Sequence, residues 1–177
     1  MTKLAGGIGS LVLLLVLGCE QAPQTEGTPA EEAAPAEKAA LAERGTLDEA
    51  RAMLQKASDH YAAVGRTQAL QDFTAKQPPF TDRDLYVFCF GPDRSTSAHG
   101  ADAAQLGRAS AELRDADGQA FATHMLDLAQ KQPDGGEIEY KWRNPVNGVV
   151  ERKISVFRKL GDDVCGVGAY QSDVASQ

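Results

Sequence analysis

The spacing of apolar positions changes several times along this chain, and each change predicts a different kind of structure. Residues 11–17 are an unbroken apolar run, and residues 20–45 carry almost no large aliphatic side chains. From Leu47 to Val64 apolar residues recur every three or four positions, which is the spacing of an amphipathic helix. From Leu85 onward the period becomes two, which is typical of strands.

Local signals predict where the helices begin and end. Thr46 and Glu49 have the spacing of a capping box, in which each side chain satisfies a backbone N–H group of the other residue. Gly65 is expected to end this first helix, and a shorter helix is expected at about 67–75. Pro78-Pro79 then favours an extended exit.

The rest of the chain predicts a sheet with one further helix. Every position from Leu85 to Phe90 is apolar, which predicts a central strand that is buried on both faces. Asn144-Pro145 and Asn147-Gly148 predict a hairpin bend. The remaining predicted elements are strands at about 95–99, 138–142, 149–160 and 164–170, and a helix whose Phe121, Met125 and Leu128 share one face.

The N-terminus predicts export. Lys3, the apolar run and the sequence Val16-Leu17-Gly18-Cys19 resemble a bacterial lipoprotein signal, in which Cys19 receives the lipid. An ordinary signal peptide with an unrelated cysteine is the alternative. We expect residues 1–18 to be the signal peptide, residues 19–45 a lipidated, disordered tether rich in Ala, Pro and Glu, and residues 46–177 a single folded domain.

Charge and motifs limit the classes of function. The chain carries 18 basic and 25 acidic residues, a net charge of −7, which disfavours binding to nucleic acid. The three histidines fall on separate predicted elements without the paired spacing of a zinc site, and no nucleophile or phosphate-binding motif occurs. We therefore predict no catalytic residues, no metal and no cofactor.

The order of elements resembles the single Cache domains, which are extracytoplasmic, PAS-like sensors of bacterial chemoreceptors and kinases. The motifs that carry the resemblance are Asp84-Leu85-Tyr86-Val87-Phe88, Ala98-His99-Gly100, Asp115-Ala116-Asp117-Gly118, Tyr140-Lys141-Trp142 with Asn144-Pro145, Lys153, and Gly166-Val167-Gly168-Ala169-Tyr170. The resemblance implies an α+β fold with a PAS-like, five-stranded antiparallel sheet and a long N-terminal helix packed behind it. It also implies a small pocket for organic molecules, often short carboxylates, and no catalytic activity.

Seven residues are candidates for the ligand site. Lys153 is the natural counter-ion for an acid, because burying an unpaired carboxylate is costly. A solvated charge on a basic hairpin is the alternative for Lys153, core packing is the alternative for the large aromatic side chains, and His99 can instead steady its hairpin. Related domains tend to carry a tyrosine where this chain has Val156. The candidates are Tyr86, Phe88, His99, Tyr140, Trp142, Lys153 and Ser155.

Together these features predict a membrane-tethered, extracytoplasmic sensor or co-receptor lipoprotein of the cell envelope. Its expected partners are a small organic acid or similar metabolite, the membrane that holds the lipid, and a receptor or kinase in that membrane. The alternative is a structural or protein-interaction lipoprotein whose pocket is degenerate. The sheet order implied by the resemblance makes the strands of Cys89 and Cys165 neighbours, so we expect a disulfide between them, with two separate buried thiols as the alternative.

Overall fold

A computed structural model describes residues 44–171. Helix α2 covers Leu47–Val64, and its capping box is confirmed: the Glu49 N–H group donates to the Thr46 hydroxyl at 3.2 Å, and the Thr46 N–H group donates to the Glu49 carboxylate at 2.8 Å. Gly65 ends α2 with a φ of 80°, a backbone conformation that favours glycine. It leads directly into α3, which covers Arg66–Thr74.

The sheet is antiparallel and has the strand order β1-β2-β6-β5-β4, with β3 paired to β2. It has six strands where five were predicted, because the short strand β1 also pairs with β2. Two short 3-10 helices, at Ala103–Gln105 and Ser110–Glu112, were not predicted. The other elements are β1 (Thr81–Asp82), β2 (Leu85–Phe90), β3 (Thr96–His99), α4 (Phe121–Lys131), β4 (Gly136–Arg143), β5 (Val150–Leu160) and β6 (Asp163–Gln171).

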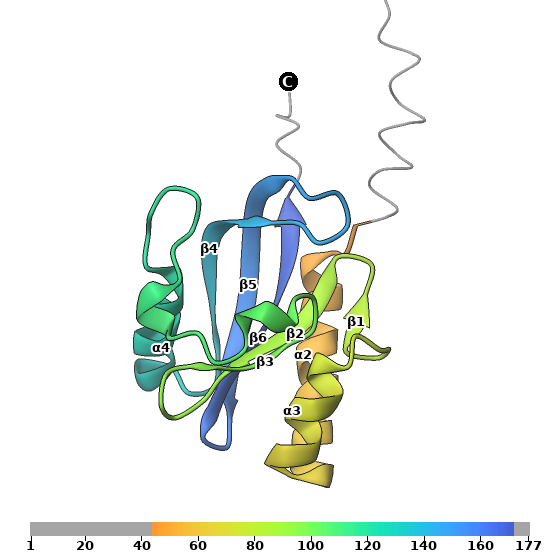
Figure 1. The fold of residues 1–177 in the computed structure, drawn as a ribbon. Coiled ribbons are helices and arrows are strands. Elements are labelled where there is room, and N and C mark those ends of the chain that lie inside the picture. Colours follow the sequence, from red (N-terminus) through yellow and green to blue (C-terminus); the bar gives the residue numbers. More distant parts are fainter. Residues whose placement is uncertain (1–43, 172–177) are drawn as a thin grey trace, which may run out of the picture.

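Helices cover both faces of the sheet. Figure 1 shows α2 and α3 on one side of the sheet and α4 on the other. The six residues of β2 are all buried and alternate between two apolar clusters, as a central strand should. Leu85, Val87 and Cys89 face α2 and α3, while the aromatic residues of β2 face α4. The α4 face therefore carries the aromatic side chains from which a ligand site can be built.

A disulfide links the two central strands. Cys89 on β2 lies directly opposite Cys165 on β6, with a Cα–Cα distance of 4.0 Å, and the structure joins their sulfur atoms. Both residues are fully buried in the cluster that faces α2 and α3. The bridge closes a loop of 76 residues across the middle of the sheet.

Asp163, at the start of β6, ties the helices to the sheet. Its carboxylate is fully buried and accepts hydrogen bonds from the Tyr61 hydroxyl at 2.7 Å, from the Arg66 guanidinium at 2.7 and 3.0 Å, and from the Ser97 hydroxyl at 2.8 Å. These donors lie on α2, on α3 and on β3. A buried charge is stable only when it is paired in this way.

The predicted signal peptide, the acylated Cys19 and nearly all of the predicted tether lie outside the described residues. Within residues 44–171, no helix is long enough and apolar enough to cross a membrane.

Candidate functional site

Lys153 lies at the centre of the aromatic face. It is on β5, directly opposite Tyr140 of β4 and Tyr170 of β6, and its side chain is completely buried. A Cβ atom at position 168 would collide with both the Lys153 chain and the Ser155 hydroxyl, so only glycine leaves space for them there. A solvated charge on the basic hairpin is therefore the wrong interpretation of Lys153.

The ammonium group of Lys153 has aromatic neighbours but no hydrogen-bond acceptor. Its Nζ lies 3.8 Å from the ring centroid of Tyr86, 4.7 Å from that of Tyr170 and 5.6 Å from that of Phe88. It has no hydrogen-bond partner in the structure. Burial lowers the pKa of Lys153 well below its usual value, and the charge of Asp84 opposes this only in part. An unpaired, buried amine of this kind is expensive, and an anion would satisfy it.

Asp84 does not serve as that anion. One of its carboxylate oxygens accepts the Gly45 N–H group at 2.6 Å, and the other accepts the Asn144 side-chain amide at 3.3 Å. Burial raises the pKa of Asp84 despite these hydrogen bonds. The carboxylate thus holds the start of α2 and the β4–β5 connection together.

Four hydroxyl groups surround the lysine in two pairs. The Tyr140 and Ser155 hydroxyls lie 3.0 Å apart, and the Tyr86 and Tyr170 hydroxyls 3.3 Å apart. The Tyr170 hydroxyl also donates to the Arg143 carbonyl at 2.8 Å. Burial raises the pKa of each of the three tyrosines, so they remain protonated and can donate hydrogen bonds.

His99 has a structural role in the turn after β3, and its contact with a ligand remains a prediction. Its Nδ1 accepts the Asp102 N–H group at 2.9 Å, which steadies the turn after β3. Burial and the nearby charge of Lys153 lower the pKa of His99 to about 3, so the ring is neutral. Because Nδ1 is an acceptor, the proton is on Nε2, and that atom can donate one hydrogen bond. The ring also lies 4.9 Å from that of Tyr86, centroid to centroid.

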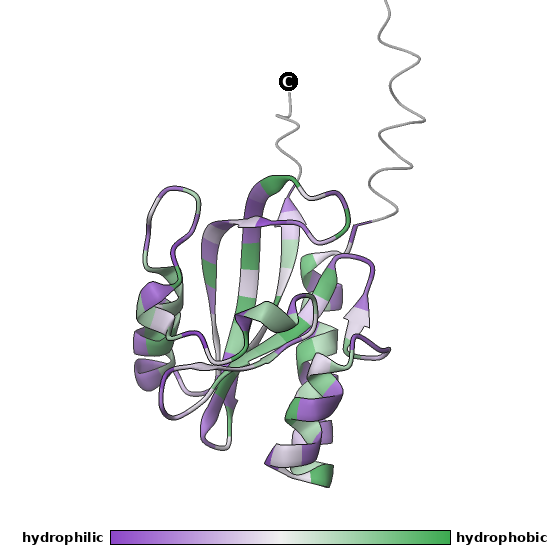
Figure 2. Cartoon of the chain, viewed as in Figure 1, coloured by the Kyte–Doolittle hydropathy of each residue, from purple (hydrophilic) through white to green (hydrophobic). Residues whose placement is uncertain are grey.

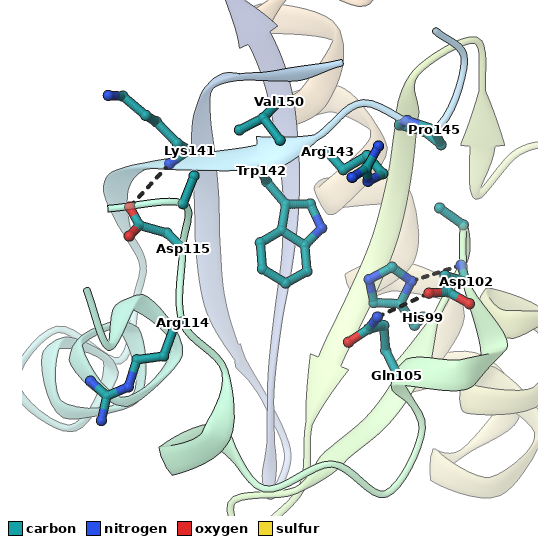
Figure 3. Close-up of a pocket in the computed structure, with 12 residues that line it drawn as sticks. His99, Asp102, Gln105, Arg114, Asp115, Lys141, Trp142, Arg143, Pro145 and Val150 are labelled. Carbon is teal, nitrogen blue, oxygen red and sulfur yellow. Dashed lines mark hydrogen bonds between the residues drawn. The ribbon is translucent and has the colours of Figure 1, made fainter. Parts of the chain in front are cut away.

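Space for a ligand is divided into an outer cleft and an inner void. The cleft has a volume of about 540 Å³, and Trp142 projects into it from β4, between Arg114 on one side and His99 with Gln105 on the other (Figure 3). The void, of about 20 Å³, lies among aromatic side chains that include Tyr140 and Phe88. His99, Gln105 and Trp142 line both spaces and therefore separate them. Neither space is lined by Lys153.

The structure thus brings five of the seven predicted residues onto one buried face and places the other two at its boundary. Tyr86, Phe88, His99, Tyr140, Lys153 and Ser155 are buried, and Trp142 is half-buried at the cleft. All seven share the side of the sheet that faces α4. The prediction that they form one group fits this arrangement, and ligand binding by them remains a prediction.

Two contributors were missed by sequence reasoning. Tyr170 contacts the lysine, and Gly168 makes room for it; both belong to the last strand, whose motif was noticed without a role. The signal that identifies them is the register of β5 against β6, which an isolated sequence does not provide. Val156 was considered as a lost ligand donor, but it packs in the cluster that faces α2 and α3. A tyrosine there would not reach the lysine from this backbone.

The basic side chains of the β4–β5 hairpin lie partly at this site, because Lys141 and Arg143 line the outer cleft. Two of these exposed charges are paired: Arg152 lies 3.7 Å from Glu139, and Lys141 lies 3.0 Å from Asp117. Among residues 44–171, no group of three His, Cys, Asp or Glu side chains is placed to hold a metal ion.

The family follows from comparison with known proteins. The sequence profile of single Cache domain 2 matches residues 44–177. The chain belongs to the single Cache domains. Cache domains are extracytoplasmic sensor domains that bind small molecules. No curated protein matches the chain in sequence.

Solved structures share the fold at low sequence identity. A methyl-accepting chemotaxis protein from Vibrio parahaemolyticus is 20% identical with a TM-score of 0.60, over 80% of this chain and 93% of its own. A Cache chemosensory domain described in terms of carboxylic acid recognition is 19% identical with a TM-score of 0.53, over 82% and 100%. The periplasmic sensor domain of a chemotaxis protein is 17% identical with a TM-score of 0.54, over 80% and 99%. These likenesses support the Cache fold of this chain.

Proposed function

We propose that this chain is a lipid-anchored, extracytoplasmic sensor or co-receptor whose Cache domain binds a small organic acid at Lys153. One observation carries the proposal: Nζ of Lys153 is completely buried and has no hydrogen-bond partner. A carboxylate there would supply a charge-assisted hydrogen bond, which is stronger than a neutral one. The tyrosine, serine and histidine donors around it would satisfy the second carboxylate oxygen.

Entry requires side chains to move. The outer cleft and the inner void share the lining residues His99, Gln105 and Trp142, neither space reaches Lys153, and the inner void is far smaller than a short carboxylic acid. Rotation of Trp142, which is only half-buried, would join the two spaces. Exclusion of water around a bound acid would strengthen its ion pair with Lys153.

Family membership adds support from outside this chain. A Cache chemosensory domain with the same fold is described in terms of carboxylic acid recognition. Acylation at Cys19, which the N-terminal sequence predicts, would keep this domain at a membrane, where a receptor or kinase in that membrane would receive the signal. The domain itself needs no catalytic group for this role.

A thermal-shift screen tests the binding. The purified protein is heated with small carboxylic acids, amines and amino acids, and a ligand that binds only the folded state raises the melting temperature. At about 100 times its dissociation constant a ligand adds about 2.7 kcal/mol of stability. We expect the response to come from acids and to disappear in Lys153→Met, while Lys159→Met, on the same strand, retains it. An equal response in Lys153→Met would remove Lys153 from the site.

One observation favours a second function. Because Lys153 lines neither the cleft nor the void, the site is filled in the empty protein, as expected of a lipoprotein that acts as a protein-interaction scaffold. The scaffold predicts no thermal shift with any member of the panel. The unsatisfied amine favours the ligand-binding function over the scaffold, because a filled core gains nothing from an unpaired lysine.

A further inference from the structure

The connection between β4 and β5 presents a cluster of exposed valines. Val146, Val149 and Val150 are 58%, 53% and 43% exposed, and they lie within five residues of one another. Among the described residues, the other large apolar side chains with comparable exposure, Val64 and Leu106, stand alone on other elements. Figure 2 shows green segments in this connection, beside the ends of β4 and β5. We call residues 145–150 the valine tip.

Several backbone groups of the valine tip are satisfied by neighbouring residues. The Asn144 side chain accepts the Val146 N–H group at 2.9 Å, and the Asn147 side chain accepts the Val149 N–H group at 2.8 Å. The Asn144 N–H group donates to the Val149 carbonyl at 2.8 Å, the Gly148 N–H group donates to the Asn144 carbonyl at 2.9 Å, and the Arg143 side chain donates to the Gly148 carbonyl. These backbone groups therefore do not depend on water for their hydrogen bonds. An apolar environment requires this, because it offers no hydrogen-bond partners of its own.

Both ends of the described chain leave beside this tip. Arg44, the first described residue, forms two hydrogen bonds of 2.8 Å with Glu151, which follows the tip directly. Gln171, the last described residue, lies opposite Arg152 in the β5–β6 pairing. Figure 1 shows the start of α2, the end of β6 and the β4–β5 connection at the same end of the domain. An anchor that precedes residue 44 therefore holds the domain by the end that carries the valine tip.

We propose that the valine tip rests on the lipid surface that holds the anchor. This inference depends on the anchoring in the proposed function. Three part-exposed valines offer far less than the roughly 800 Å² per partner of a standard protein interface, which argues against a stable protein complex at this tip. A lipid contact needs no such area, because a tether raises the local concentration of the surface and makes a weak contact sufficient.

Spin labels on the lipid-anchored protein test this contact. A cysteine that carries a nitroxide replaces Val146 or Val149 in the acylated protein, reconstituted on vesicles of phosphatidylethanolamine and phosphatidylglycerol. Cys89 and Cys165 are bonded to each other and do not take the label. The control label replaces Val64, which is 42% exposed at the other end of α2. Power saturation compares collisions with oxygen, which partitions into lipid, and with a water-soluble nickel chelate.

On anchoring to vesicles, the ratio of oxygen to nickel collisions should rise several-fold at positions 146 and 149 and stay unchanged at position 64. In each labelled protein, replacing Val150 and the other unlabelled valine of the tip with serine should reduce the rise in this ratio. Equal ratios at all three positions, in protein that floats with the vesicles, would overturn this inference and leave the anchor intact. Protein that does not float with vesicles would overturn the anchor, and the contact with it. Labels that respond only when a second envelope protein is added would also overturn the lipid contact.

Discussion

Replacing Lys153 with methionine should make the empty protein more stable. Nζ of Lys153 is fully buried and unpaired, so the folded state bears the cost of dehydrating the amine without gaining a partner. Methionine has a similar length, carries no charge and makes favourable contacts with aromatic rings. This substitution leaves the neighbouring strands unchanged, and it removes the one group that the structure leaves unsatisfied at the centre of the aromatic face.

The size of the effect follows from two opposing contributions. Replacing a buried ion pair with apolar side chains is often neutral or stabilises a protein by about 1–4 kcal/mol, and an amine without a partner has no ion-pair energy to lose. Loss of the cation–π contacts with Tyr86 and Tyr170, at 3.8 and 4.7 Å, offsets part of this gain, and each such contact is worth about 0.5–2 kcal/mol. We expect a net gain of about 1–2 kcal/mol at pH 7, which corresponds to a rise in melting temperature of about 3–8 °C.

The gain should depend on pH with a defined sign. The folded pKa of Lys153 is lowered, so between that value and the pKa of an exposed lysine the unfolded chain binds a proton that the folded protein does not. The contribution of Lys153 to the free energy of unfolding of the wild-type protein therefore falls as pH decreases from about 10. It stops falling below the folded pKa of Lys153. The advantage of Lys153→Met should be small near pH 10 and larger at pH 7.

Urea denaturation of both proteins at pH 7 and pH 9.5 measures this difference. Lys159→Met, the same substitution at a half-buried position of β5, should change stability by no more than about 0.5 kcal/mol. A Lys153→Met protein that is less stable than wild type at pH 7, or a difference that is independent of pH, would refute the reasoning. Either result would mean that the lysine already has a partner or reaches water.

Three further predictions concern the ligand and the cysteines. Above the folded pKa of Lys153 the amine is neutral in the empty site, so binding of a carboxylate there should take up protons. Calorimetry in buffers of different ionisation enthalpy measures this uptake. Binding without proton uptake across pH 7 to 10 would contradict the prediction. Cys19→Ser should abolish acylation and shift the protein out of the detergent-extracted membrane fraction, whereas an unchanged mature mass would show that no lipid is attached there. Thiol counting on the denatured, unreduced protein should find neither Cys89 nor Cys165 free, and replacing both with serine should cost about 2–4 kcal/mol; two free thiols would reject the bridge.

Local signals in the sequence were sufficient for most of the fold. The capping box at Thr46 and Glu49, the turn at Gly65 and the apolar alternation of β2 depend on neighbouring residues, and each appears where it was predicted. The sixth strand was missed because β1 has only two residues, Thr81 and Asp82, which is too short for any periodic signal. The 3-10 helices after β3 were missed for the same reason.

The candidate site was less accessible from sequence because it depends on strand register. The type of residue at Tyr86, Tyr140 and Lys153 suggested a polar group among aromatic rings, and the structure places them together. Tyr170 enters only because β5 and β6 pair at that register. Strand alternation alone puts Val156 on the face opposite to Lys153, because the two residues are three positions apart on one strand. The position of Trp142 between the cleft and the void is a consequence of packing in three dimensions, which no local pattern encodes.

A crystal structure of the protein with the acid that gives the largest thermal shift tests the central claim most directly. A carboxylate oxygen should lie about 2.7–2.9 Å from Nζ of Lys153, and Trp142 should have moved so that the outer cleft opens to the lysine. An acid bound only in the outer cleft, with Lys153 still enclosed by Tyr86 and Tyr170, would contradict it.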